Sequence, residues 1–296
     1  MNSKNNQKCA PSKKYVNGSC FDIKDLKLIA KSYNERKNVK NKININVEKE
    51  DLVNQLENKL KNVCDDQICW LRQDFVKKIN SEEISKNTFK PIGPKGKYEW
   101  LSTTNINDVV EQYMSVHKDF IFLGAVPIDF DDLPILGLAD LNFKELQGGG
   151  KDKLGIVFNL DEHYKSGSHW VALYADLNKN QVYYFDSYGK KPEKRIRRFV
   201  SRIVKYLYDK EYHKTLEIKN VINELKGGNI NKETFTELRK FDINYNKVRH
   251  QFKNSECGVY SINFILRLLD GQKFKHVSLN KTYDDKMNAN RKEYFR

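Results

Sequence analysis

A cysteine follows a glutamine by six residues in the stretch Gln251-Phe252-Lys253-Asn254-Ser255-Glu256-Cys257-Gly258-Val259. Gly271 is a typical helix stop, and the apolar residues between the cysteine and this stop have helical spacing: Val259, Ile262, Ile265, Leu266 and Leu269. Cys257 is therefore predicted to lie at a helix N-terminus, where the helix macrodipole favours a thiolate.

Three apolar runs upstream are typical of buried strands, at residues 155–160, 170–174 and 182–185, with a turn at residues 178–180. His169 stands at the entry of the second strand, and Asp186 stands at the exit of the third. Because an antiparallel hairpin brings those two ends together, the imidazole and the carboxylate are expected to touch.

These residue types match the needs of nucleophilic attack on an amide. Such attack requires a thiolate, a base, a third group that orients the base, and donors for the oxyanion. Cys257, His169, Asp186 and Gln251 suit those four roles, in that order.

Together these residues resemble the Ulp1/adenain-type cysteine peptidases, which include SUMO-processing, adenovirus-type and virion-maturation proteases. The resemblance rests on His169-Trp170, on Asp186 seventeen residues later, and on Gln251 followed by Cys257-Gly258. It extends to Trp100-Leu101 and covers about residues 95 to 275. The chain departs from the family at Glu256 and at Ser102 or Thr103, where the family usually has Asp.

The resemblance implies an α+β, papain-like catalytic core with a mixed sheet and an N-terminal helical arm. It also implies a thiol protease that needs no metal and no organic cofactor. In this family two tryptophans flank a tunnel that accepts only glycine before the cut, and Trp100 and Trp170 match those positions. Ordinary core packing is the alternative role for both indoles.

Within the group, the chain is most similar to the proteases of large cytoplasmic DNA viruses, the asfarvirus- and poxvirus-like branch. The similarity lies in the basic N-terminal region with Cys9 and Cys20, in residues 100–104 and 122–127, and in the Lys- and Asn-rich composition. It implies cleavage of viral structural polyproteins after Gly-Gly-like sites during virion maturation. The expected location is the viral factory in the host cytoplasm, and the virion.

A Gly/Pro cluster at residues 92–96 predicts the boundary between two parts. Residues 1–90 carry helical patterns and form the predicted helical arm, and residues 91–296 form the predicted protease core. The arm is expected to contact substrate or a partner, with stabilisation of the core as the alternative. Two Gly runs, at residues 148–150 and 227–228, are either self-cleavage sites or, more commonly, flexible connections.

Composition agrees with a globular enzyme. The chain has 296 residues, of which 39% are hydrophobic, and no apolar run of membrane-spanning length. The N-terminus lacks the apolar segment of a secretion signal. Five cysteines in such a chain predict free thiols in a reducing compartment. Apart from Cys257, the cysteines are Cys9, Cys20, Cys64 and Cys69. Zinc binding by these four is not expected, because their spacing is irregular and no His lies near them in the sequence.

The net charge is +14, and residues 190–198 form a basic stretch at the start of a predicted helix. A weak contact with nucleic acid is one interpretation of this basic surface. A solvated, Lys-biased surface is the favoured one.

Two other functions remain open. One is a deconjugating isopeptidase that acts on SUMO or ubiquitin-like modifiers with the same chemistry. The other is a catalytically inactive nucleic-acid-binding module, against which the complete set of catalytic residue types argues.

Overall fold

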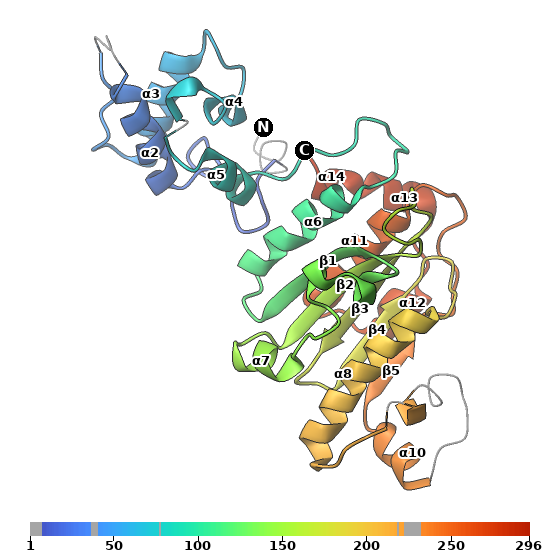
Figure 1. Ribbon diagram of the computed structural model, residues 1–296. Coiled ribbons are helices and arrows are strands. Elements are labelled where there is room, and N and C mark those ends of the chain that lie inside the picture. The colour runs from blue at the N-terminus through green and yellow to red at the C-terminus, as the bar shows by residue number, and fades with distance from the viewer. Residues whose placement is uncertain (1–7, 37–40, 77, 218, 222–231) are drawn as a thin grey trace. The chain divides into compact units, whose positions relative to one another are not determined.

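The computed structural model describes residues 8–36, 41–76, 78–217, 219–221 and 232–296. The chain forms two compact units (Figure 1). The first holds Met1–Gly93 together with the C-terminal Lys292–Arg296, and the second holds Pro94–Arg291. The C-terminal residues are fixed to the first unit in part by the Arg296 N–H, which donates to the Pro91 carbonyl at 3.1 Å.

Short helices build the first unit, and their apolar faces meet in one core. Leu52 and Leu56 are fully buried one helical turn apart, as their spacing predicts. Phe21 stacks on Trp70 with ring centroids 6.1 Å apart and meets the edge of Phe89 at 5.0 Å. The helices are α2 (Ile23–Asn34), α3 (Lys49–Leu60), α4 (Gln67–Trp70), the 3-10 turn η1 (Asp74–Val76) and α5 (Ser81–Thr88).

Four of the five cysteines form disulfides in this unit, so the prediction of free thiols is wrong. Cys9 pairs with Cys20 and Cys64 with Cys69, each with 5.4 Å between Cα atoms. That separation lies within the range that a disulfide requires. The number of cysteines alone does not determine whether they are free, because the fold brings these four together in pairs.

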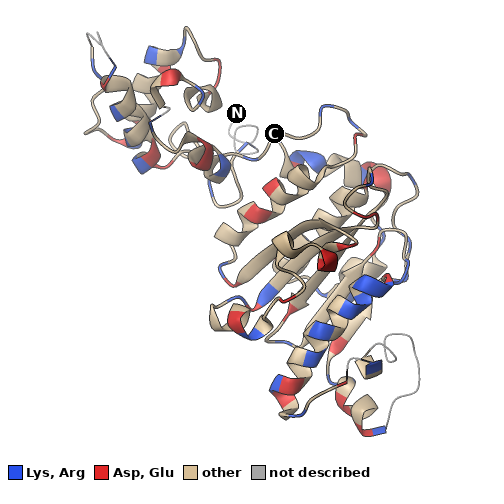
Figure 2. Cartoon of the chain, in the orientation of Figure 1, with Lys and Arg blue, Asp and Glu red and all other residues tan. Residues whose placement is uncertain are grey.

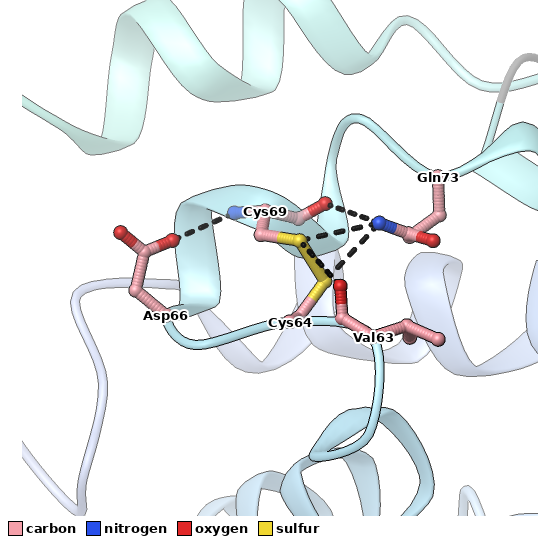
Figure 3. The surroundings of a disulfide bond; sticks show 5 residues. All are labelled: Val63, Cys64, Asp66, Cys69 and Gln73. Atoms are coloured by element: carbon pink, nitrogen blue, oxygen red, sulfur yellow. Dashed lines mark hydrogen bonds between the residues drawn. A yellow bond between two sulfur atoms is a disulfide. The ribbon is translucent and has the colours of Figure 1, made fainter.

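The Cys64–Cys69 disulfide is held by a small polar network (Figure 3). The Gln73 Nε2 group donates to the sulfurs of Cys64 and Cys69 at 3.1 and 3.2 Å. Asp66 caps α4 by accepting from the Cys69 N–H at 2.9 Å. Within the described residues, no group of three or more His, Cys, Asp and Glu side chains is arranged to hold a metal ion.

One five-stranded mixed sheet organises the second unit. The strands lie in the order β1-β2-β3-β4-β5, and β2, β3 and β4 are antiparallel neighbours. The outer strands β1 and β5 run parallel to their neighbours, so each needs a crossover connection. The strands are β1 (Phe120–Pro127), β2 (Lys153–Asn159), β3 (Trp170–Asp176), β4 (Gln181–Phe185) and β5 (Asp242–Tyr245).

Helices cover both faces of this sheet (Figure 1). Alternate β2 residues point to opposite sides: Ile156 joins the core under α8 (Lys194–Tyr212), whereas Gly155 lies against Ile265 of α11 (Cys257–Leu269). α8 packs on the sheet through one apolar face, and its buried residues are Ile196, Phe199, Val200, Ser201, Ile203, Val204, Leu207 and Tyr208. The predicted α+β class with a mixed sheet is confirmed.

Shorter helices complete the unit. α6 (Thr103–Gln112) packs on β1, and α7 (Phe143–Gly148) lies in the crossover to β2. Gly150 follows α7 with φ +78°, a left-handed conformation common after a helix end. The second Gly run, at residues 227–228, lies outside the described residues. The others in this unit are α10 (Lys232–Leu238), α12 (Phe274–Leu279) and α13 (Asp284–Ala289), whereas α14 (Arg291–Tyr294) falls in the first unit apart from its first residue. Within the described residues, no helix is long and apolar enough to cross a bilayer.

Candidate active site

The start of α11 places Cys257, which is its first residue and is buried. The preceding Glu256 is also buried, and its carboxylate is satisfied on all sides. It accepts from Arg291 Nε at 3.0 Å, from Asn288 Nδ2 at 2.8 Å and from Ser255 Oγ at 3.0 Å. These contacts hold the start of α11 in place, so Glu256 has a structural role next to the Cys257 thiol.

The β3–β4 hairpin brings His169 and Asp186 together. His169 immediately precedes β3 and Asp186 immediately follows β4, and the two strands are antiparallel partners. His169 Nε2 lies 2.7 Å from Asp186 Oδ1, with both side chains buried. Cys257 also interacts with this imidazole and raises the pKa of His169. Because Nε2 faces Asp186, Nδ1 is the nitrogen that remains for Cys257.

The electrostatics of this cluster favour a protonated imidazole. Burial is the largest single influence and lowers the pKa of His169. The hydrogen bonds and charges of Asp186 and Cys257 together outweigh it and raise the pKa to about 9. The arrangement therefore favours an imidazolium next to the sulfur.

Tyr188 stacks on the imidazole, which sequence reasoning missed. Its ring centroid lies 4.5 Å from that of His169, and the ring planes differ by 17°. The Tyr188 N–H also donates to Asp186 Oδ1 at 2.8 Å. One residue therefore restrains both the imidazole plane and the carboxylate.

Gln251 lies on the loop before α11 and is fully buried. Its Oε1 accepts from the Ser187 hydroxyl at 2.6 Å. Its Nε2 has no hydrogen-bond partner within the described part of the chain. A buried amide group without a partner is rare and costly, and it is expected where a ligand atom supplies the missing acceptor.

Trp100 and Trp170 line one cleft of about 440 Å³ together with Pro127 and Asn159. Trp170 is buried, and its indole N–H donates to the Leu101 carbonyl at 2.9 Å. Trp100 is 41% exposed. The hydrogen bond ties the segment before α6 to the start of β3, so residues from both segments line the same cleft.

Leu101 also packs on α11. A Cβ at Gly258 would lie 3.0 Å from Leu101 Cβ, so glycine after Cys257 permits this close approach. A larger cavity of about 760 Å³ lies over β3, β4, β5 and α12, and none of the four candidate catalytic residues lines it. Cavity size alone would therefore have indicated the wrong place.

Comparison with known proteins agrees with this geometry. Residues 150–296 match the family model described as the Ulp1 protease family, C-terminal catalytic domain. A protein of Acanthamoeba polyphaga mimivirus, named as a thiol protease, is 32% identical over 298 residues, which cover 95% of this chain and 90% of that protein. An African swine fever virus protein named as a SUMO-1 cysteine protease is 24% identical over 253 residues, covering 79% and 83% of the two chains.

The fold has solved counterparts. A crystal structure of the African swine fever virus protease is similar with a TM-score of 0.61 and 20% identity, covering 98% of this chain and 96% of that one. A second crystal structure of that protease gives a TM-score of 0.60 and 21% identity, over 89% and 94% of the two chains. The predicted Ulp1-type fold is therefore confirmed, and the chain belongs to the Ulp1 family as a viral-type cysteine protease.

Proposed function

We propose that the chain is an endopeptidase that cleaves viral structural polyproteins after Gly-Gly-like pairs, with Cys257 as nucleophile. The observation that carries the proposal is the buried His169–Asp186 contact, with Cys257 raising the pKa of the same imidazole and with a buried Gln251 Nε2 that has no partner among the described residues. The expected places of action are the viral factory and the virion.

In the first step the Cys257 sulfur attacks the scissile carbonyl, and its proton resides on His169. The carbonyl π bond breaks and leaves a tetrahedral oxyanion. His169 then gives its proton to the leaving amine as the C–N bond breaks, which forms an acyl-enzyme. Water, deprotonated by His169, attacks the thioester carbonyl, and the C–S bond then breaks, which releases the acid and restores the Cys257 thiolate beside the protonated His169. Asp186 holds the ring with Nδ1 toward the sulfur throughout.

The oxyanion needs donors that are fixed before it forms. Gln251 Nε2 and the Cys257 main-chain N–H at the start of α11 are assigned this role. Such a donor is worth roughly 3–4 kcal/mol in acyl-transfer enzymes. Support comes from the complete burial of Gln251 and from its Nε2, which finds no hydrogen-bond partner in the part of the chain that the structure describes.

Glycine selectivity is assigned to Trp100 and Trp170. A Gly-Gly segment has no side chains, so two indoles can close over its backbone and exclude larger residues. Their positions on the same cleft support this role.

The helix α8 carries many Lys and Arg residues (Figure 2), which is the basis for a contact with nucleic acid. Several of these cations are already bound within the protein. Arg195 pairs with Asp131 and Asp132. Arg202 donates to two main-chain carbonyls, and Lys205 pairs with Asp209. Cations that are already paired release fewer counterions from a polyanion, so the proposal is limited to protein substrates.

The test is cleavage of purified candidate polyproteins and of SUMO and ubiquitin conjugates, with products identified by mass spectrometry. New C-termini that end in Gly-Gly within polyproteins support the proposal. Cleavage of modifier conjugates alone would assign the site to deconjugation. Cys257→Ala and His169→Ala should abolish cleavage, whereas His276→Ala, at an exposed histidine on α12, should leave it intact. Full activity of Cys257→Ala would refute the mechanism.

A further inference from the structure

Two adjacent residues at the exit of β4 hold two different parts of the site. Asp186 holds the base through the Oδ1–Nε2 contact with His169. Ser187 directs its hydroxyl to the Gln251 carboxamide. Both Asp186 and Ser187 are 1% exposed, so water does not compete for these bonds.

Ser187 makes three hydrogen bonds with the His250–Gln251 segment. The hydroxyl donates to Oε1 at 2.6 Å, and the Ser187 carbonyl accepts from the Gln251 N–H at 2.9 Å. The same carbonyl accepts from the His250 N–H at 2.8 Å. The main-chain bonds set the place of Gln251, and the hydroxyl acts on the side chain alone.

A carboxamide has an acceptor edge and a donor edge, and rotation of the terminal torsion by half a turn exchanges them. A hydroxyl that donates to Oε1 fixes the acceptor edge on Ser187. The Nε2 edge, which has no partner within the described residues, then faces away from Ser187. In the opposite orientation Oε1 would be presented to an oxyanion and would repel it.

We propose that Ser187 is a positioning residue that orients the Gln251 carboxamide as an oxyanion donor. The inference rests on the proposed oxyanion role of Gln251 and deepens it. Donation into Oε1 also polarises the amide, which strengthens the N–H groups as donors.

The turn after β4 delivers Ser187 in a fixed position. Gly189 ends this turn with φ +74°, and its N–H donates to the Asp186 carbonyl at 2.7 Å. A Cβ at Gly189 would lie 3.0 Å from the Val248 carbonyl carbon and 3.1 Å from the Arg249 nitrogen. The turn therefore lies directly against the loop that leads to Gln251, and the hydroxyl has little freedom to move.

The experiment is a double-mutant cycle between Ser187 and Gln251, measured as kcat and KM on one Gly-Gly peptide with the full chain. Ser187→Ala should lower kcat about 5- to 10-fold with KM unchanged, as expected for loss of one orienting hydrogen bond. Ser187→Thr keeps the hydroxyl and should recover most of kcat. In a Gln251→Ala background, Ser187→Ala should have no further effect on kcat.

Two controls separate positioning from a general structural effect. Ser201→Ala removes another buried hydroxyl, on α8, and should leave kcat unchanged. The rate of Cys257 alkylation by iodoacetamide against pH should be the same in Ser187→Ala and wild type, because the Cys257–His169–Asp186 contacts do not include Ser187.

The outcomes are distinct. Wild-type kcat in Ser187→Ala, or a further loss when it is combined with Gln251→Ala, would overturn the inference. If Gln251→Ala itself keeps wild-type kcat, the proposed oxyanion role fails first. Should Ser187→Ala not fold, Ser187→Gly, which adds no volume, takes its place in the same cycle with the same expected result.

Discussion

The Asn246 carboxamide binds both main-chain polar groups of Asp186. Its Oδ1 accepts from the Asp186 N–H at 2.8 Å, and its Nδ2 donates to the Asp186 carbonyl at 2.7 Å. Asn246 is buried and comes directly after β5, so the strand that pairs with β4 also fixes the residue that orients the imidazole.

Asn246→Asp should therefore be more damaging than Asn246→Ala. The alanine leaves the buried Asp186 N–H unpaired, which costs about 1–3 kcal/mol, and it removes one of the two donors to the Asp186 carbonyl, which keeps the Gly189 N–H. The aspartate would add a carboxylate oxygen facing the Asp186 carbonyl. Denaturant unfolding and kcat should both show the order wild type, alanine, aspartate. Asn244→Ala, at an exposed position on β5, serves as the control. Equal stability of Asn246→Asp and wild type would contradict the clamp.

The raised pKa of His169 predicts the alkaline limit of activity. In the proposed mechanism the imidazolium protonates the leaving amine, so kcat should fall as pH rises through about 9. The associated stability has the same sign: because the folded-state pKa exceeds the unfolded value, this stability is fully present below about pH 6.5 and is lost through about pH 9.

Asp186→Asn tests this cause directly. It removes the charge that raises the pKa of His169, so the alkaline limb of a kcat–pH profile should move to lower pH, and kcat should fall at every pH. A limb that stays near pH 9 in Asp186→Asn would show that Asp186 does not control the imidazole.

The sequence predicts the parts of this site that depend on local periodicity. Alternation and turn signals place His169 and Asp186 at adjoining ends of a hairpin, and helical spacing places Cys257 at a helix start. Ser187 and Asn246 could not be assigned in this way. Their contacts depend on the parallel pairing of β4 with β5, which is reached only after the crossover through α8. Cysteine pairing likewise depends on distances between segments, which spacing alone does not give.

The two tryptophans should differ in their effects. Trp170→Phe keeps an aromatic wall but loses the donor to the Leu101 carbonyl, and it should retain glycine selectivity with modest loss of stability. Trp100→Ala removes a half-exposed ring and should relax selectivity with little effect on folding. The measurement is the ratio of kcat/KM for peptides with glycine and leucine before the cut. A ratio near one in wild type would rule out an aromatic slot.

The disulfides predict a specific thiol count. Native protein should titrate as one thiol, Cys257, and fully reduced, denatured protein as five. Cys9→Ser with Cys20→Ser should destabilise the first unit by about 2–4 kcal/mol, because it frees the unfolded chain from a loop constraint. The Cys64–Cys69 disulfide closes a shorter loop, so Cys64→Ser with Cys69→Ser should lower the stability of this unit by less. Five reactive thiols in freshly purified native protein would contradict both pairings.

The division of the chain predicts how a catalytic fragment must end. Residues 292–296 belong with the first unit, where Phe295 is 7% exposed and packs against the Gly93 backbone. A fragment of residues 94–291 should therefore fold better than residues 94–296, in which Phe295 loses its partners and exposes apolar surface.

The shorter fragment also tests the role assigned to the N-terminal arm. Residues 94–291 contain the whole Cys257–His169–Asp186 cluster and both cleft tryptophans, so the fragment should cleave a short Gly-Gly peptide. If the arm recruits substrate, the fragment should lose activity on an intact polyprotein and keep its activity on the peptide. Adding the arm as a separate chain at low concentration should not restore polyprotein cleavage, because the covalent link supplies a high local concentration. Equal activity of fragment and full chain on both substrates would leave the arm without a role in recognition. Loss of both activities in a soluble, folded fragment would instead assign the arm to support of the active site.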